Sequence, residues 1–192
     1  MKMKKGSIVG IIILVVIALI ALSAIGSYND LVSKKEDVDS KYSDISVQLE
    51  RRADLIPNLV NTVKGYMEHE ENIIDKVTKA RENLVNAKTV EEKANANQEL
   101  TTSINNLIAV VENYPDLKAN ENFINLQDEL AGTENRIAVA RKDYNDTVKS
   151  YNKTIKSFPK NLFASMFGFD EADYFEAKES SNEVPNVSFK ED

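Results

Sequence analysis

The sequence predicts an all-α protein: an N-terminal transmembrane helix, an antiparallel bundle of three to four long helices, and an aromatic-rich C-terminal tail. An uncharged apolar run, residues 8–25, follows three lysines. Beyond it glycine and proline are scarce, and apolar residues recur at heptad spacing, a combination that favours long helices over a sheet. We expect a basic flank at residues 1–7, the transmembrane helix at 8–26, the bundle at 27–158 and the tail at 159–192.

The apolar run is long enough to cross a bilayer. Its eighteen positions hold one polar side chain, Ser23, and as a helix they span roughly 27 Å, about one hydrocarbon core. A cleaved signal peptide is the alternative, because Ala24 and Gly26 are small residues of the kind found at cleavage sites. The apolar part of a signal peptide normally has only about 7 to 15 residues. We therefore expect an uncleaved, single-pass anchor in the cell membrane.

The charges on either side of the run predict its orientation. Lys2, Lys4 and Lys5 precede it, whereas Lys34 and Lys35 follow it among acidic residues. The positive-inside rule then places the N-terminus in the cytoplasm and the body outside.

The body of the protein is strongly acidic. The whole chain carries a net charge of −7, and removing residues 1–27 takes away three lysines and no acidic residue, which leaves a net charge of −10. Such a body repels nucleic acid, so no nucleic-acid partner is expected.

The heptad pattern predicts a first helix from residue 28 to residue 88. Pro57 lies inside it and would deprive the carbonyl of Ala53 of its usual donor, which would kink the helix. Two antiparallel helices broken near Pro57 are the alternative. One heptad series consists of Leu31, Val38, Ile45, Arg52, Leu59, Tyr66, Ile73, Ala80 and Ala87.

The remaining helices have local start and stop signals. Thr89 and Glu92 form a capping-box pair at the start of the next helix, which Pro115 ends. The last long helix runs from about residue 120 to residue 157. We expect the tail phenylalanines to cap the bundle or to dock onto a partner, and residues 184–189 to be extended. The tail phenylalanines are Phe158, Phe163, Phe167, Phe169, Phe175 and Phe189.

Four charged residues lie on the apolar stripes of the long helices: Arg52, Glu70, Glu134 and Arg141. We expect them to pair with one another and to fix the register of the helices, because a buried unpaired charge is costly.

The surroundings of Pro57 are the candidate structural or interaction site. Arg51, Arg52 and Asp54 lie within two turns of this proline. Their arginine side chains could satisfy the carbonyls that a kink frees, or pair with Glu134 across the bundle.

Catalytic motifs are absent from the sequence. It has no cysteine and one histidine, His69, and the H-E-x-x-H pattern that begins there has Ile73 in place of the second histidine. No phosphate-binding glycine motif and no G-x-S-x-G is found. We therefore expect no enzyme and no cofactor. A divalent-metal hydrolase remains the alternative, with His69 and the carboxylates Glu68, Glu70, Glu71 and Asp75 as its site.

The length of the first helix predicts self-association. A helix of about 60 residues is roughly 90 Å long, and the two shorter helices that follow, running down and back, would leave part of its apolar seam uncovered. We expect the seam formed by Val38, Tyr42, Ile45 and Leu49 to pack against a second copy, giving a homo-oligomer.

Three stretches of the chain resemble a known family. They are VQLERRADLIPNLVNTVKGYMEHEENIIDKVTKAR at residues 47–81, ENYPDLKANENFINLQDELAGTENRIAVARKDYNDTVKSYN at residues 112–152, and FPKNLFASMFGF with DYFEA near the C-terminus. The sequence resembles the LemA family of bacterial membrane proteins. The resemblance implies a single-pass membrane protein with a helical-bundle body and no established activity or catalytic residues. Some members are described with a cytosolic body.

Pattern and resemblance together favour a membrane-anchored scaffold or protein-interaction protein. An accessory or sensor protein for a membrane protease or transporter is the alternative that the same features allow. Neither requires a cofactor.

Overall fold

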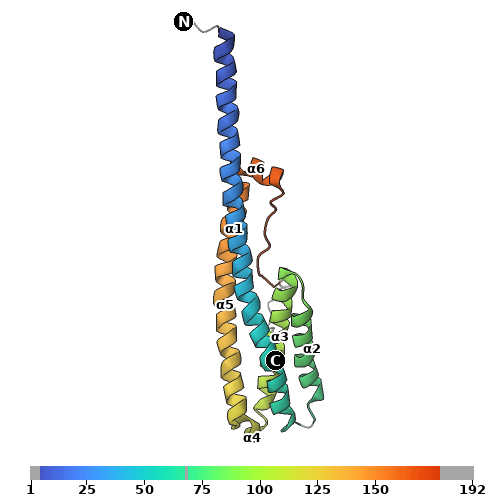
Figure 1. Ribbon diagram of the computed structural model, residues 1–192. Helices are drawn as coiled ribbons and strands as arrows, with labels where there is room; N and C mark the ends of the chain where they lie inside the picture. Colours follow the sequence, from blue (N-terminus) through green and yellow to red (C-terminus); the bar gives the residue numbers. More distant parts are fainter. Residues whose placement is uncertain (1–4, 68, 178–192) are drawn as a thin grey trace, which may run out of the picture. The chain divides into compact units, whose positions relative to one another are not determined.

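The structure, a computed structural model, describes residues 5–67 and 69–177 (Figure 1). It is all-α, as predicted, and these residues contain no strand. The helices are α1 (Lys5–Lys64), α2 (Glu71–Asn86), α3 (Val90–Val111), α4 (Pro115–Lys118), α5 (Glu121–Lys156) and α6 (Lys160–Phe167).

Helix α1 contains both the apolar run and the first part of the heptad pattern. Its most apolar window is long and apolar enough to cross a membrane, and the described residues bury none of it. This window lies near the N-terminus, and it is consistent with a membrane anchor or with a signal sequence.

The predicted first helix is correct in one respect and wrong in another. Helix α1 continues through Pro57, as predicted, and the alternative of two helices broken near this proline is not found. It ends at Lys64 and not at residue 88. Just after Lys64 the N–H groups of Tyr66 and Met67 donate to the carbonyl of Val63 and close a turn. Gly65, a poor helix former, opens this turn, and α2 resumes the heptad pattern after it.

The other helix ends follow their sequence signals. The capping box is present: Glu92 N donates to Thr89 Oγ1 and Thr89 N to Glu92 Oε2, both at 3.1 Å. Pro115 is the first residue of α4, where its missing N–H costs nothing. Helix α5 has nearly the bounds that the sequence predicts.

The chain divides into two compact units. Unit 1 comprises residues 1–48 and 135–174, and unit 2 comprises residues 49–134 and 175–192. The long helices α1 and α5 each contribute to both units, because α5 pairs with α1 in each of them.

The core of unit 1 is made by facing residues of α1 and α5. The ring of Tyr42 lies 5.8 Å from the ring of Tyr144 between their centroids. The buried residues of the two helices keep the heptad spacing on which they were predicted. They are Leu31, Val38 and Ile45 on α1 and Ile137, Tyr144, Val148, Tyr151 and Ile155 on α5.

An extended segment after α6 is fastened to α5 in unit 1. Asn152 binds the backbone of Ala172 twice, accepting from its N–H and donating to its carbonyl, both at 2.9 Å. The hydroxyls of Tyr144 and Tyr151 donate to the carbonyls of Asp173 and Asp170, at 2.7 and 2.9 Å. We call residues 170–173 the strap. Burial raises the pKa of Tyr144 to about 12, so its phenol remains a donor at neutral pH.

Several tail aromatics pack within the chain, which is one of the two expectations for them, whereas Phe158 is exposed. In unit 1 the ring of Tyr28 lies 5.1 Å from that of Phe167 and 5.9 Å from that of Phe169, edge to face. In unit 2 Phe175 is buried. The expected extended stretch at residues 184–189, with Phe189, lies outside the described residues.

Candidate functional site

A buried arginine joins three helices of unit 2. Arg52, on α1, is only 3% exposed. Its Nη1 donates to Oδ1 of Asn97 on α3 at 2.7 Å and to Oε2 of Glu134 on α5. The expected pairing of Arg52 with Glu134 is therefore present. One guanidinium thus holds α3 and α5 to the same level of α1.

The electrostatics of this cluster are those of a partly compensated buried charge. Burial lowers the pKa of Arg52, and the charge and hydrogen bond of Glu134 act in the opposite direction. An arginine keeps its proton at neutral pH, so the pair is ionic. Glu134 is 43% exposed at its side chain and remains in contact with water, whereas Nε of Arg52 is buried without a partner among the described residues.

A second arginine repairs the helix at Pro57. This proline has no N–H, so the carbonyl of Ala53 lacks the donor that an α-helix normally supplies. Nε of Arg81, on α2, donates to that carbonyl at 2.9 Å. The sequence left two roles open for Arg51 and Arg52, satisfying such a carbonyl or pairing with Glu134. Arg52 pairs with Glu134, and the carbonyl of Ala53 is bound by Arg81, a residue of the next helix.

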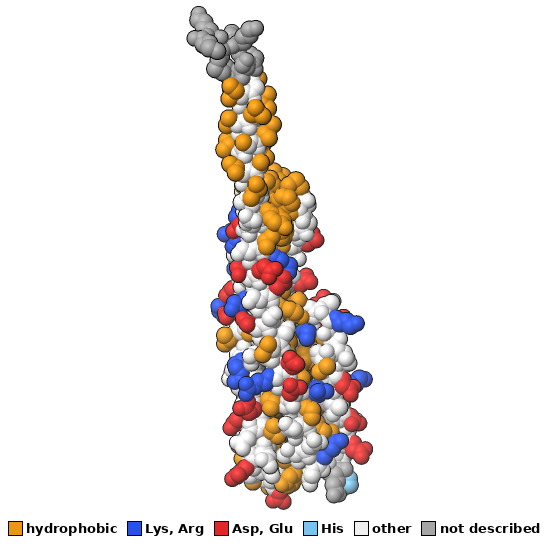
Figure 2. All heavy atoms as spheres, in the orientation of Figure 1, with side chains coloured by type: hydrophobic (Ala, Val, Ile, Leu, Met, Phe, Trp, Pro, Cys, Tyr) orange, Lys and Arg blue, Asp and Glu red, His pale blue; other side chains and the backbone are white. Residues whose placement is uncertain are grey.

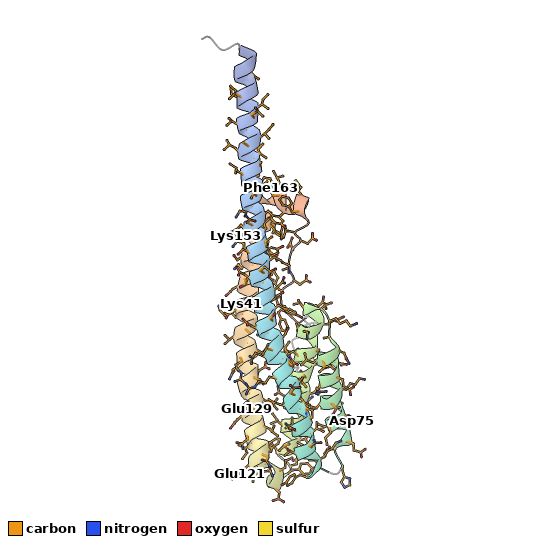
Figure 3. All side chains as sticks on the ribbon, in the orientation of Figure 1. Lys41, Asp75, Glu121, Glu129, Lys153 and Phe163 are labelled. Carbon is orange, nitrogen blue, oxygen red and sulfur yellow. The ribbon has the colours of Figure 1, made fainter. Side chains whose placement is uncertain are left out.

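The other candidate residues do not join this cluster. Arg51 is exposed and pairs at 3.0 Å with Glu129 of α5, which Figure 3 labels. Asp54 and Pro57 are exposed, and Arg141 is exposed in unit 1. Glu70 accepts a 3.2 Å hydrogen bond from the hydroxyl of Tyr114.

The predicted self-association seam is covered within the chain. Val38, Ile45 and Leu49 are at most 2% exposed, and the ring of Tyr42 lies against Tyr144. The prediction that an uncovered seam needs a second copy was wrong in its premise. The first helix ends 24 residues earlier than expected, so α2 and α3 form a short hairpin and α5 is free to follow α1.

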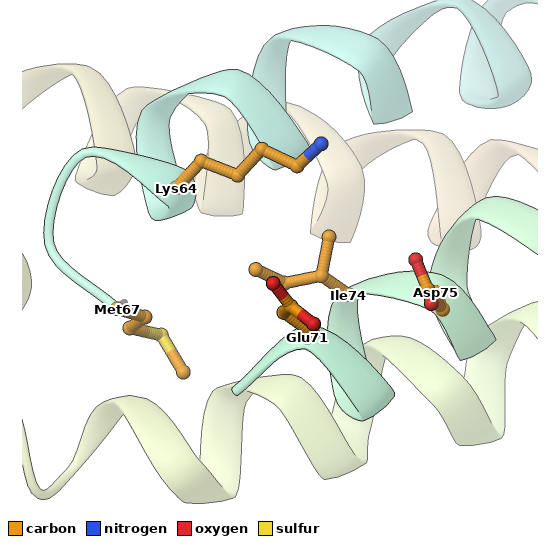
Figure 4. A pocket seen from close by; sticks show the side chains of 5 residues that line it. All are labelled: Lys64, Met67, Glu71, Ile74 and Asp75. Carbon is orange, nitrogen blue, oxygen red and sulfur yellow. The ribbon is translucent and has the colours of Figure 1, made fainter. Parts of the chain in front are cut away.

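The acidic cluster predicted for the hydrolase alternative lies partly at a surface pocket of unit 2. This pocket, of about 440 Å³, is lined by Lys64 at the end of α1, Met67, and Glu71, Ile74 and Asp75 (Figure 4). No group of three or more acidic, histidine or cysteine side chains that could hold a metal ion is found in the part of the chain that the structure describes. Glu68 lies outside that part.

Sequence reasoning missed Arg81 and Asn97. Asn97 had a signal: it lies three residues before Leu100 on the apolar stripe of α3, where a buried amide needs a partner. Arg81 had none in its own neighbourhood, since the group it satisfies belongs to a residue 28 positions earlier.

These features define an all-α protein in which an N-terminal apolar helix continues into packed helices whose buried charges serve packing. The chain belongs to the LemA family, whose model matches residues 41–189.

Individual relatives agree with this assignment. Magnetosome protein MamQ 2 of Paramagnetospirillum magneticum is 25% identical over 92% of this chain and 75% of its own length. Magnetosome protein MamQ of Magnetospirillum gryphiswaldense is 23% identical over the same shares. Protein LemA of Metamycoplasma hominis is 24% identical over 63% of this chain and 56% of its own length.

The first prediction concerns the Arg52 cluster. Glu134→Gln leaves the buried guanidinium without its counter-charge, and we expect the free energy of unfolding to fall by about 1–3 kcal/mol, less than for a fully buried pair because Glu134 is half exposed. Thermal unfolding of the full chain in detergent micelles, followed by circular dichroism, measures it. Glu129→Gln on the same helix is the control and should cost less than about 0.5 kcal/mol. Equal costs would contradict a packing role for the pair.

The second prediction concerns the repair at Pro57. Arg81→Met leaves the carbonyl of Ala53 without a donor and should cost about 1–2 kcal/mol. In a Pro57→Ala background the new N–H supplies that donor, so the same substitution should cost about 1 kcal/mol less. The double-mutant cycle is measured by the same unfolding experiment, with Lys79→Met on the exposed side of α2 as the control. Purely additive effects would show that the hydrogen bond is not what couples the two sites.

Proposed function

We propose that this protein is a membrane-anchored helical scaffold or protein-interaction protein without catalytic activity. The observation that carries the proposal is the continuity of α1. One helix runs from an apolar stretch that none of the described residues cover to the packed region around Arg52, which ends at Lys64.

The use of the charged side chains supports the non-catalytic part of the proposal. The most buried charge, Arg52, is committed to two helix partners, and Arg81 is committed to a backbone carbonyl. Both groups serve helix packing. The work of the protein then falls to the surfaces of its helices.

We further propose that the apolar stretch is an uncleaved span with the N-terminus in the cytoplasm and the body outside. The three lysines before the stretch support this orientation.

The orientation can be measured because the chain has no cysteine. Val139→Cys places a thiol on α5 at a position that is 62% exposed. We expect a membrane-impermeant maleimide to label it in intact cells, because the body lies outside. Ile17→Cys, in the apolar stretch, is the control that should stay unlabelled. Labelling of Val139→Cys only after lysis would place the body in the cytoplasm.

The interaction function is tested by site-specific photo-crosslinking in native membranes. A photoreactive amino acid at the exposed Val85 of α2 or Val139 of α5 should give discrete products whose masses depend on the position. Leu84, which is buried, is the matched control for Val85 and should give none. Products identified as copies of this chain would make the scaffold a homo-oligomer. The absence of products from every exposed position would count against the proposal.

A thermal-shift measurement with divalent metal ions distinguishes the hydrolase alternative from the scaffold. We expect Mg²⁺, Mn²⁺, Ca²⁺ and Zn²⁺ to leave the melting temperature unchanged, because a ligand stabilises only a fold that binds it. A metal-dependent rise that His69→Ala and Glu70→Ala abolish would favour the hydrolase over the scaffold.

A further inference from the structure

Helix α6 is packed against α1 just beyond the apolar stretch. Its Phe167, and Phe169 after it, contact the ring of Tyr28 at centroid distances of 5.1 and 5.9 Å. Nζ of Lys160, at the start of α6, lies 2.6 Å from Oδ2 of Asp30. All these groups belong to unit 1. These contacts hold α6 to the first turns of α1 that follow the apolar stretch.

Large apolar side chains on α6 and just before it are not covered by the rest of the described chain. Phe158 is 82% exposed, Leu162 60% and Met166 64%. Leu162 and Met166 are four residues apart on α6 and lie in one row, and Phe158 lies in the turn just before the helix. Ala164, by contrast, is buried, and Phe163, labelled in Figure 3, stacks on Phe167 with a centroid distance of 6.5 Å. Figure 2 shows hydrophobic side chains around the apolar part of α1 and again over the region of α6.

The position of Tyr28 along α1 gives the depth of α6. The apolar stretch ends at Ile25, and three further residues advance the helix by about 4.5 Å. If the stretch fills the hydrocarbon core, Tyr28 lies in the headgroup layer, which is roughly 5–8 Å thick on each side. Tyrosine is enriched in that layer, and α6, which contacts Tyr28, shares its depth.

We propose that α6 is an interfacial membrane helix: Phe158, Leu162 and Met166 enter the boundary between headgroups and acyl chains of the bilayer that α1 crosses. The proposal rests on the membrane anchoring proposed above. Lipid of that same bilayer covers this apolar side of α6, because α1 holds α6 at the bilayer surface. A soluble partner would have to displace the headgroups that contact these side chains.

The binding is apolar in character. Lys160 is the single charged residue of α6, and it is paired with Asp30. Beside it, Lys156 is paired with Glu171 at 2.7 Å. With these charges compensated, insertion depends on the buried apolar area, not on attraction to anionic lipids. Unit 1 therefore contacts the bilayer at two places, the span and α6.

The absence of tryptophan from the chain makes the test direct. Full-length protein carrying a single tryptophan at Met166, at Leu162, at Ile17 or at Val139 is reconstituted in phosphatidylcholine vesicles. Its fluorescence is compared with and without lipids brominated near the headgroup or near the chain end. All four positions are exposed in the chain, so the substitutions leave its packing intact.

We expect Met166→Trp and Leu162→Trp to be quenched most by the shallow bromines and Ile17→Trp most by the deep ones. Val139→Trp lies on α5 of the same unit, about 26 Å along the helix from the end of α5 at Lys156, and should be quenched by neither. Vesicles with anionic lipid should give the same result.

The outcomes separate the two proposals. If Ile17→Trp is not quenched, the anchor itself fails. If Ile17→Trp is quenched and both α6 reporters are not, the anchor stands and the interfacial helix is wrong. Blue-shifted but unquenched α6 reporters would show that protein, such as a second copy, covers this face. Quenching that requires anionic lipid would overturn the apolar mechanism.

Discussion

The guanidinium of Arg52 is the constraint on which unit 2 depends. Arg52 is only 3% exposed, and a buried charge is tolerated only where hydrogen-bond acceptors contact it. Here the acceptors belong to two other helices, α3 and α5. An apolar residue at this position could be packed by many arrangements of those helices. The guanidinium is compatible only with helix arrangements in which Asn97 and Glu134 both reach it. It therefore selects the register of the bundle as well as adding to its stability.

The repair at Pro57 follows the same logic with a backbone group. Proline creates an acceptor on α1 that α1 cannot satisfy, and the donor comes from α2. A local defect in one helix thus becomes a specific attachment point for another. Since Ala53 follows Arg52 directly in the chain, the two attachments lie at adjacent positions and fix α2, α3 and α5 to one short stretch of α1.

The sequence was sufficient for those elements that local physics decides. The capping box of Thr89 and Glu92 and the bounds of α5 are set by neighbouring residues, and both were predicted. The end of α1 was not predicted. Helix α2 continues the heptad series in the same phase after the turn that follows Lys64, so the periodicity alone does not distinguish two helices from one. The Arg52–Glu134 pair could be anticipated from charges on apolar stripes. The role of Arg81 could not, since only the tertiary fold brings it to Ala53.

The strap of residues 170–173 has a consequence for how this family can diverge. The hydrogen bonds that hold it to Tyr144, Tyr151 and Asn152 use its backbone: the N–H and carbonyl of Ala172 and the carbonyls of Asp170 and Asp173. Its Glu171 side chain also pairs with Lys156, but both groups are exposed and such a pair adds little. The information for its placement therefore resides in Tyr144, Tyr151 and Asn152 of α5, not in the strap's own side chains. Homologues can therefore change the side chains of this segment and keep its path. A change at any of those three positions of α5 instead removes a hydrogen bond that the side chains of the segment cannot replace.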